Sequence, residues 1–302
     1  MNIFNILDSK FDLSEKIKNL SKLLLEKNFF VYNGYYTSFE NFFDLIYFRK
    51  WNYSYGCYNL KEFREKLELN YSYDYSNNND LYFCIEDEIS AINFLQYAYN
   101  VTRFVKECLY NDIEYSITKD INDFYEIFDI QFNYILSKMN HRIIKHPKEN
   151  YYLLVPCNDK TTRCAELQQK FDVSFLLYEY TSLLIVNNVE KKREILKLLA
   201  NELEPIINDN LKIYNSGPVH DIFFELNSCL NNFNIRHNNS DPRRIKYFHE
   251  LLNSFSQQDY LNVYDMTYDL ILNAILINNY QSITKQTYLK YKKKAGLEKT
   301  DK

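Results

Sequence analysis

Glycine and proline are scarce in this chain, with 4 Gly and 5 Pro among 302 residues. β-Sandwiches and barrels need many tight turns, which these two residues supply, and the common nucleotide-binding folds need glycine-rich phosphate loops. The scarcity therefore favours helices joined by polar connectors. Because 46% of the residues are hydrophobic, the chain can bury the core of one large domain or of two ordinary ones.

Apolar residues recur at three- and four-residue intervals along most of the chain, which is typical of amphipathic helices. In the first half this spacing predicts helices over residues 12–28, 60–69, 86–110 and 119–139, and a capping box at 37–40 predicts another helix start. In the second half it predicts helices over 160–171, 173–186, 189–205, 218–230, 245–255 and 260–277. Pro205 is expected to bend or end its helix, and Gly217-Pro218 to begin the next one.

Two segments depart from the helical pattern. Residues 70–80 are polar and aromatic without periodicity, which indicates a surface loop. Residues 142–145 and 151–156 are short apolar runs around a turn, which predict one β-hairpin. The expected fold is mainly α, a two-part helical protein with one small β-hairpin. We expect an N-terminal helical domain at 1–140 and a C-terminal helical domain at 141–302 that begins with the hairpin.

Charge and motif content exclude several classes of protein. The net charge of −4 argues against an overall basic nucleic-acid binder, although a local basic patch remains compatible with it. Neither a cationic, apolar leader nor a run of roughly 18 apolar residues is present, so we expect a cytoplasmic protein without a membrane segment.

The six cysteines are scattered, which predicts free and mostly buried thiols. No compact zinc spacing, P-loop or dinucleotide motif occurs, so no metal and no cofactor are expected.

One segment is rich in groups that bind phosphate or transfer protons. Between residues 233 and 250 lie Arg236, His237, Asn238, Asn239, Arg243, Arg244, Lys246 and His249. A histidine can remove the proton of a ribose 2′-hydroxyl while an arginine stabilises the charge on the attacked phosphate, so such a set can cleave RNA without a metal and would refuse DNA. The same residues also fit a solvated connector between two amphipathic helices.

The segment 234–239, between two helices and preceded by Leu226-Asn227 and Leu230-Asn231, resembles the HEPN superfamily (higher eukaryotes and prokaryotes nucleotide-binding domains). The similarity is to the C-terminal domains of AbiJ-like abortive-infection proteins of bacteria, and residues 149–156 and 191–205 are similar to segments that accompany that domain. The family signature is an arginine, then a polar residue, then a histidine four to six positions after the arginine. Arg236-His237 supplies the first two, whereas Arg244 and His249 supply the spacing with Ile245 in the polar position.

The resemblance implies a C-terminal helical bundle that acts as a metal-independent RNase, often as a homodimer, in abortive infection or as a toxin in antiphage defence. It assigns phosphate binding to Arg236 and Arg244, the role of base to His249 or His237, and substrate orientation to Asn238. Further substrate contacts are expected from Asn239, Arg243 and Lys246. The implied partners are RNA, a second copy, and a neutralising or sensor protein. The alternative is a non-catalytic helical interaction module or an inactive HEPN-like regulatory subunit.

Overall fold

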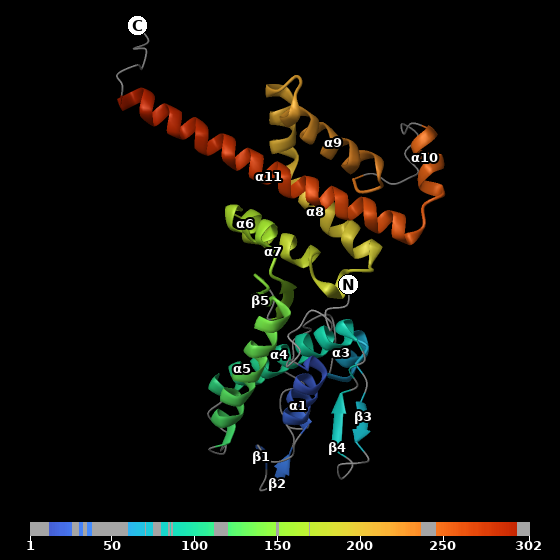
Figure 1. Cartoon of the computed structure of the whole chain (residues 1–302), viewed down its shortest axis with the longest axis vertical. Coiled ribbons are helices and arrows are strands. Elements are labelled where there is room, and N and C mark those ends of the chain that lie inside the picture. The colour runs from blue at the N-terminus through green and yellow to red at the C-terminus, as the bar shows by residue number, and fades with distance from the viewer. Residues whose placement is uncertain are drawn as a thin grey trace. The chain divides into compact units, whose positions relative to one another are not determined.

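The computed structural model describes residues 12–25, 30–32, 35–37, 60–69, 71–74, 80–83, 85, 87–111, 120–148, 151–168, 170–236 and 246–294. As expected, the fold is mainly α (Figure 1). The chain divides into two compact units, an N-terminal unit of Met1–Cys157 with Ser182–Leu184, and a C-terminal unit of Asn158–Thr181 with Ile185–Lys302. Among the described helices, none has the length and apolar content needed to cross a membrane.

The N-terminal unit holds four described helices and three antiparallel strand pairs. The helices are α1 (Leu13–Leu25), α3 (Leu60–Lys66), α4 (Glu88–Asn111) and α5 (Asp120–Met139), which confirms the helices predicted from periodicity there. The strand pairs are β1 (Phe30–Tyr32) with β2 (Tyr35–Thr37), β3 (Tyr71–Asp74) with β4 (Asp80–Phe83), and β5 (His141–Lys145) with β6 (Tyr152–Pro156). The capping box begins at the last residue of β2, and its residues 38–40 lie outside the described part.

The loop predicted at 70–80 is wrong for Tyr71–Asp74, which form β3, and for Asp80, which begins the paired strand β4. The reason is tertiary: the backbone N–H of Phe83 donates to Ser21 Oγ of α1 at 2.7 Å, and the Phe83 ring is buried in the core. The ring lies against Phe94 and Tyr97 of α4, with centroids 5.1 and 5.5 Å away. Strand formation depends strongly on such packing against neighbours, so a short polar and aromatic segment was not recognised as a strand from its sequence.

The predicted hairpin β5–β6 is confirmed, and two amides of α4 hold it. β6 pairs with β5 along one edge, so the backbone groups of Tyr152 and Leu154 face away from that ladder. Gln96 accepts from Leu154 N–H at 2.5 Å and donates to Tyr152 C=O, while Asn100 accepts from Tyr152 N–H at 2.7 Å and donates to the same carbonyl at 2.8 Å. The hairpin therefore belongs to the N-terminal unit, whereas the sequence placed it at the start of the C-terminal domain.

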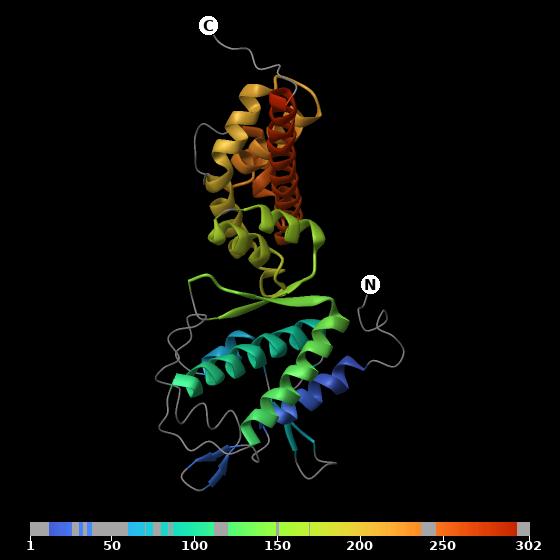
Figure 2. The same ribbon diagram turned by 90° about the vertical axis from the view of Figure 1, so that its left-hand side faces the viewer.

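The C-terminal unit contains α6 (Asp159–Leu167), α7 (Phe171–Tyr180), α8 (Val189–Ile213), α9 (Pro218–Asn232), α10 (Lys246–Asn253) and α11 (Gln257–Lys294). A short 3-10 turn at Leu183–Ile185 follows α7. Helices α8, α9 and α11 lie side by side in both views (Figures 1 and 2). These helices lie where the sequence predicted helices, but α7 ends at Tyr180, before the predicted end at residue 186, and α11 continues past the predicted end at residue 277.

Local signals set two of the helix starts. Asn188 caps α8 by accepting from the N–H of Lys191, and α9 begins with Pro218 after Gly217, whose φ of 95° suits glycine. The helix does not end at Pro205, since α8 runs through it to Ile213. The buried face of α8 continues on both sides of Pro205 with Leu203 and Ile207, and this packing offsets the hydrogen bond that the proline cannot donate.

Candidate functional site

The structure describes only part of the predicted cluster. Arg236 is described with its side chain, and it closes the turn after α9. Lys246 and His249 lie in α10, where the backbone alone is described. The remaining predicted site residues, His237, Asn238, Asn239, Arg243 and Arg244, lie outside the described residues. The side-chain contacts described below are therefore those of residues 234–236, where the Arg- and His-rich segment follows α9.

A tight turn fixes that starting point. Asn234 adopts a left-handed conformation with φ of 62°, which asparagine tolerates better than most residues. Ile235 is completely buried, and the N–H of Arg236 donates to the carbonyl of Leu230 at 3.0 Å. From α8, Arg193 Nε donates to the carbonyl of Asn234 at 2.5 Å. The turn is thus held by backbone conformation, by a buried side chain and by a neighbouring helix.

The Arg236 guanidinium ties α9 to α8. Its Nη1 lies 3.3 Å from Asn227 Oδ1 and 3.5 Å from Asn231 Oδ1, and its Nη2 donates to the carbonyl of Ala200 at 3.3 Å. Burial lowers the pKa of Arg236, and the carboxylate of Glu204 opposes that shift. Its Nε–H is buried and has no hydrogen-bond partner among the described residues. In this arrangement most of the guanidinium fork is used by the protein itself.

These contacts bear on whether Arg236, one of the two arginines predicted to bind a phosphate, can do so. A guanidinium binds a phosphate best with two parallel N–H groups, but three of the five N–H groups of Arg236 already donate to protein oxygens, and its Nε–H is buried. Arg236 is therefore suited to positioning the segment. The one-turn spacing of Asn227 and Asn231 on α9, followed by Arg236, is the sequence signal that could have indicated this role, because residues four apart share one side of a helix.

A second polar cluster, which sequence reasoning missed, joins α7, α8 and α11. Lys192 is buried, and its Nζ donates to Asp265 Oδ1, which also accepts from the hydroxyl of Tyr180. Tyr268 stacks on Tyr180 at 4.1 Å and donates to the carbonyl of Leu177 at 2.7 Å. Burial raises the pKa of both tyrosines, and Asp265 adds to the shift at Tyr180.

An ammonium, a carboxylate and a phenol at hydrogen-bond distance are groups that can transfer protons. Lys192, however, is only 4% exposed, so a substrate cannot reach its amine and the cluster is structural. No local spacing predicts it, because Lys192 and Asp265 are 73 residues apart.

The histidines and cysteines near the hairpin are also described. His141 is buried with Nδ1 2.7 Å from the carbonyl of Met139, and burial lowers its pKa. Cys164 is a buried free thiol, whereas Cys157 is exposed. Within the described residues, no three His, Cys, Asp or Glu side chains are grouped so that they could hold a metal ion.

Comparison of the chain with protein-family models, with curated proteins and with solved structures gives no match.

Proposed function

We propose that the C-terminal unit is a metal-independent endoribonuclease whose reaction is carried by the segment between α9 and α10. The observation behind the proposal is the fixed turn 234–236, held by Arg193 and Arg236, from which an Arg- and His-rich segment leads into the helix that carries His249. Catalytic groups on a connector need a rigid starting point, since small displacements cost much of the rate.

In the proposed reaction, Arg244 binds the scissile phosphate, because Arg236 is committed to α8 and α9. His249 or His237 removes the proton of the ribose 2′-hydroxyl. The 2′-oxygen then attacks the adjacent phosphorus, the bond from phosphorus to the 5′-oxygen breaks, and the leaving 5′-oxygen takes a proton. The products are a 2′,3′-cyclic phosphate and a 5′-hydroxyl, and DNA is not cleaved. Asn238, Asn239, Arg243 and Lys246 are proposed to orient the RNA.

The test is incubation of the purified 302-residue protein with total RNA in excess chelator, followed by identification of the fragment ends. We expect cyclic phosphate ends, and activity lower by at least about 10²-fold in His249→Ala or His237→Ala, whichever removes the base, and in Arg244→Ala. His220→Ala is the matched control, since this histidine lies in the first turn of α9 and stacks on Phe224. Full activity in all three variants would overturn the assignment of roles.

The proposed biological setting is the cytoplasm of a bacterium, where the activity would arrest growth during phage infection or serve as a toxin. A homodimer that brings two segments together is part of the proposal, as is a neutralising or sensor protein. Expression of the wild-type chain is expected to stop growth, whereas an inactive His249 or Arg244 variant should not. Multi-angle light scattering of the purified protein tests the dimer.

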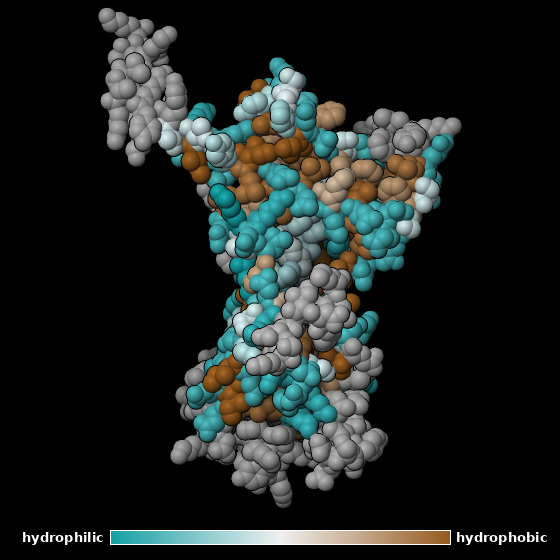
Figure 3. Space-filling view, viewed as in Figure 1, coloured by the Kyte–Doolittle hydropathy of each residue, from teal (hydrophilic) through white to brown (hydrophobic). Residues whose placement is uncertain are grey.

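A non-catalytic interaction module is the second candidate, and exposed apolar side chains favour it. Phe224 of α9 and Met266 and Ile283 of α11 are 57%, 47% and 54% exposed. Figure 3 shows hydrophobic surface gathered on one face of the C-terminal unit. Large exposed apolar patches often mark protein interfaces. This function predicts intact RNA at every protein concentration, and loss of a co-purified partner in Phe224→Ser.

A further inference from the structure

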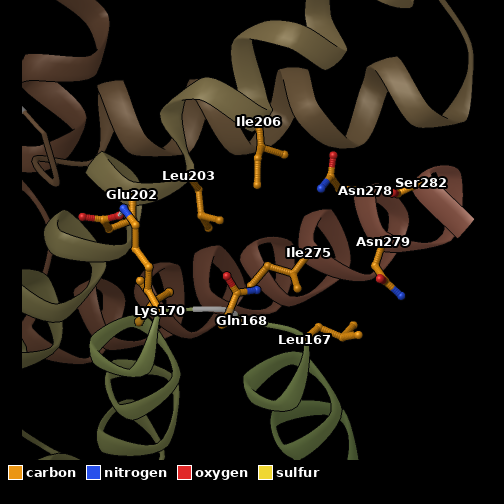
Figure 4. A pocket seen from close by; sticks show the side chains of 11 residues that line it. Leu167, Gln168, Lys170, Glu202, Leu203, Ile206, Ile275, Asn278, Asn279 and Ser282 are labelled. Carbon is orange, nitrogen blue, oxygen red and sulfur yellow. Dashed lines mark hydrogen bonds and ion pairs between the residues drawn. The ribbon is translucent and has the colours of Figure 1, made fainter. Parts of the chain in front are cut away.

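Helix α11 has two apolar sides, and its inner side forms part of the core of the C-terminal unit. That side contacts α6, α8 and α9, and its buried residues are Leu261, Tyr264, Tyr268, Ile271, Leu272 and Ile275. In Figure 4, Ile275 faces Leu203 and Ile206 of α8, beside the small cavity between α6, α7, α8 and α11. The inner side therefore accounts for the packing of α11 within its own unit.

The outer side of α11 carries a second apolar stripe, whose residues follow one another at alternating intervals of three and four. This outer stripe consists of Val263, Met266, Leu270, Asn273, Ile277 and Tyr280. Met266 and Tyr280 are 47% and 72% exposed, and the other four residues are half-buried. The spacing repeats every seven residues, which is typical of helices that pair along their length. Because a helix that is apolar all round is normally buried all round, the outer stripe indicates a second helix as its partner.

The C-terminal end of α11 is also without support from its own unit. Residues 282–287 are all exposed, and Figure 1 shows this end of the helix standing apart from α6, α8 and α9. Helices in proteins gain most of their stability from packing along one face, and short isolated helices are marginal in water. Thr284 continues the spacing of the outer stripe into this end. A helix lying along the stripe would therefore stabilise the end as well.

The charges of α11 are separated along its length. Its acidic residues, Asp259, Asp265 and Asp269, lie in the N-terminal part, and its five lysines lie between Lys285 and Lys294. Asp265 and Asp269 pair with lysines of their own chain but remain 55% and 67% exposed, so a second cation can approach them. A second α11 running in the opposite direction would place acidic beside basic parts, whereas a parallel one would place lysines beside lysines. The charges thus fit an antiparallel copy of the same helix.

The polar residue of the outer stripe fits the same arrangement. Asn273 lies near the middle of the stripe, and a single polar residue at such a position fixes the register of paired helices. In an antiparallel pair centred on Asn273, the two amides meet, and each can both donate and accept a hydrogen bond. The same register places Met266 beside Tyr280 of the other copy and Asp259 near its Lys285. One register therefore satisfies the apolar, polar and charged residues together.

We propose that the outer stripe of α11 binds a second copy of this chain, with the two α11 helices antiparallel and crossing near Asn273. The interface is two-fold symmetric, because both copies use the same surface. It gives the homodimer of the proposed function a defined surface and rests on that function only for the dimer, since none of the residues proposed for RNA cleavage takes part. A dimer that leaves RNA intact, or a monomer that cleaves it, would separate the two proposals.

The first test is multi-angle light scattering of the purified 302-residue protein without RNA, at concentrations up to about 100 µM. We expect twice the mass of one chain. Met266→Glu and Tyr280→Glu, at positions exposed in the single chain, should each raise the dissociation constant of the dimer at least about tenfold, because each would bury a charge in the interface. A monomer at every concentration, or a dimer that neither variant weakens, overturns the proposal.

Two control variants add the same charge away from the stripe. Ser282→Glu lies on another side of α11, and Ile213→Glu replaces a 68% exposed apolar residue at the end of α8. Both should leave the dissociation constant within about twofold of the wild-type value. Weakening by the controls equal to that by Met266→Glu would also overturn the assignment of the interface.

Cysteine cross-linking tests the direction of the two helices. In a Cys157→Ser background, which removes an exposed native thiol, Asn273→Cys should form a disulfide between two copies under mild oxidation. Thr284→Cys should not, because antiparallel pairing about residue 273 separates the two 284 positions by about 33 Å. An equal mixture of Val263→Cys and Thr284→Cys chains should give the mixed disulfide. Disulfide-linked dimers of Thr284→Cys alone would show parallel pairing and contradict the proposal.

Discussion

Lys192 Nζ lies 2.6 Å from Asp265 Oδ1, in an ion pair whose lysine side chain is 6% exposed and whose aspartate side chain is 55% exposed. The same carboxylate oxygen accepts from the hydroxyl of Tyr180 at 2.9 Å, and the ammonium lies 5.0 Å from the centre of the Tyr180 ring. Helices α7, α8 and α11 therefore meet at one buried charge. The two partners of the ion pair are unequal, because the aspartate reaches water and the lysine does not.

Because the two partners differ in exposure, substituting one or the other should lower the free energy of unfolding by different amounts. Asp265→Ala leaves the buried ammonium without its carboxylate and should lower the free energy of unfolding by about 2–3 kcal/mol. Lys192→Met removes the charge, keeps the volume and leaves the carboxylate in water, so it should cost less than Asp265→Ala. Urea denaturation measures both. Asp269→Ala breaks the more exposed pair with Lys160 and, as the control, should cost less than about 1 kcal/mol. Equal losses in Asp265→Ala and Lys192→Met would contradict the reasoning.

The two stacked tyrosines predict a loss of stability at alkaline pH. Burial holds the pKa of Tyr180 and of Tyr268 above the ordinary value, so the unfolded chain releases these protons first. Stability should be unaffected by them below about pH 10 and should then fall by about 1.4 kcal/mol per pH unit for each tyrosine. Tyr180→Phe should reduce that slope, whereas Tyr280→Phe, at a residue that is 72% exposed, is the control. Urea denaturation between pH 9 and about 11 measures the slopes.

The thiols are expected to differ in reactivity. Burial raises the pKa of Cys164 to about 11, so at pH 8 only about 0.1% of it is thiolate, which is the reactive form. Cys157 is exposed. Brief alkylation of the native protein, followed by peptide mass spectrometry, should label Cys157 well before Cys164. In denaturant the two should react alike. Early labelling of Cys164 in the native protein would show that the helices around it open readily.

The side-chain amide of Gln96 should contribute strongly to the stability of the N-terminal unit. Gln96→Leu leaves the N–H of Leu154 without its partner in a buried place, which should lower the free energy of unfolding by about 1–3 kcal/mol. Faster hydrogen exchange at the Leu154 amide is expected in the same variant. Gln131→Leu on α5 is the control, since the Gln131 amide makes no hydrogen bond to the described residues. Unchanged exchange at Leu154 would mean that the hairpin does not depend on α4.

Part of the fold and little of the candidate site could be predicted from the sequence. The spacing of apolar residues predicted α4 and α5 almost to their ends, and Gly217-Pro218 predicted the start of α9. For the candidate site, the sequence predicted phosphate binding by both Arg236 and Arg244, and the structure adds the protein contacts of Arg236. One of these contacts could not be predicted, because the carbonyl of Ala200, which accepts from the Arg236 guanidinium, is 36 residues away in the chain.

The sequence by itself determined the helices, the turn chemistry and the hairpin, because these depend on neighbours within a turn or two of the chain. Only the tertiary structure decided that α8 continues through Pro205, that residues 71–74 pair as a strand, and that the hairpin belongs with α4. The contact between Lys192 and Asp265 and the cavity between four helices also arise only in the tertiary structure. The physical reason is that burial and hydrogen bonding between residues far apart in the chain carry these features, and such partners leave no periodic pattern in a single sequence.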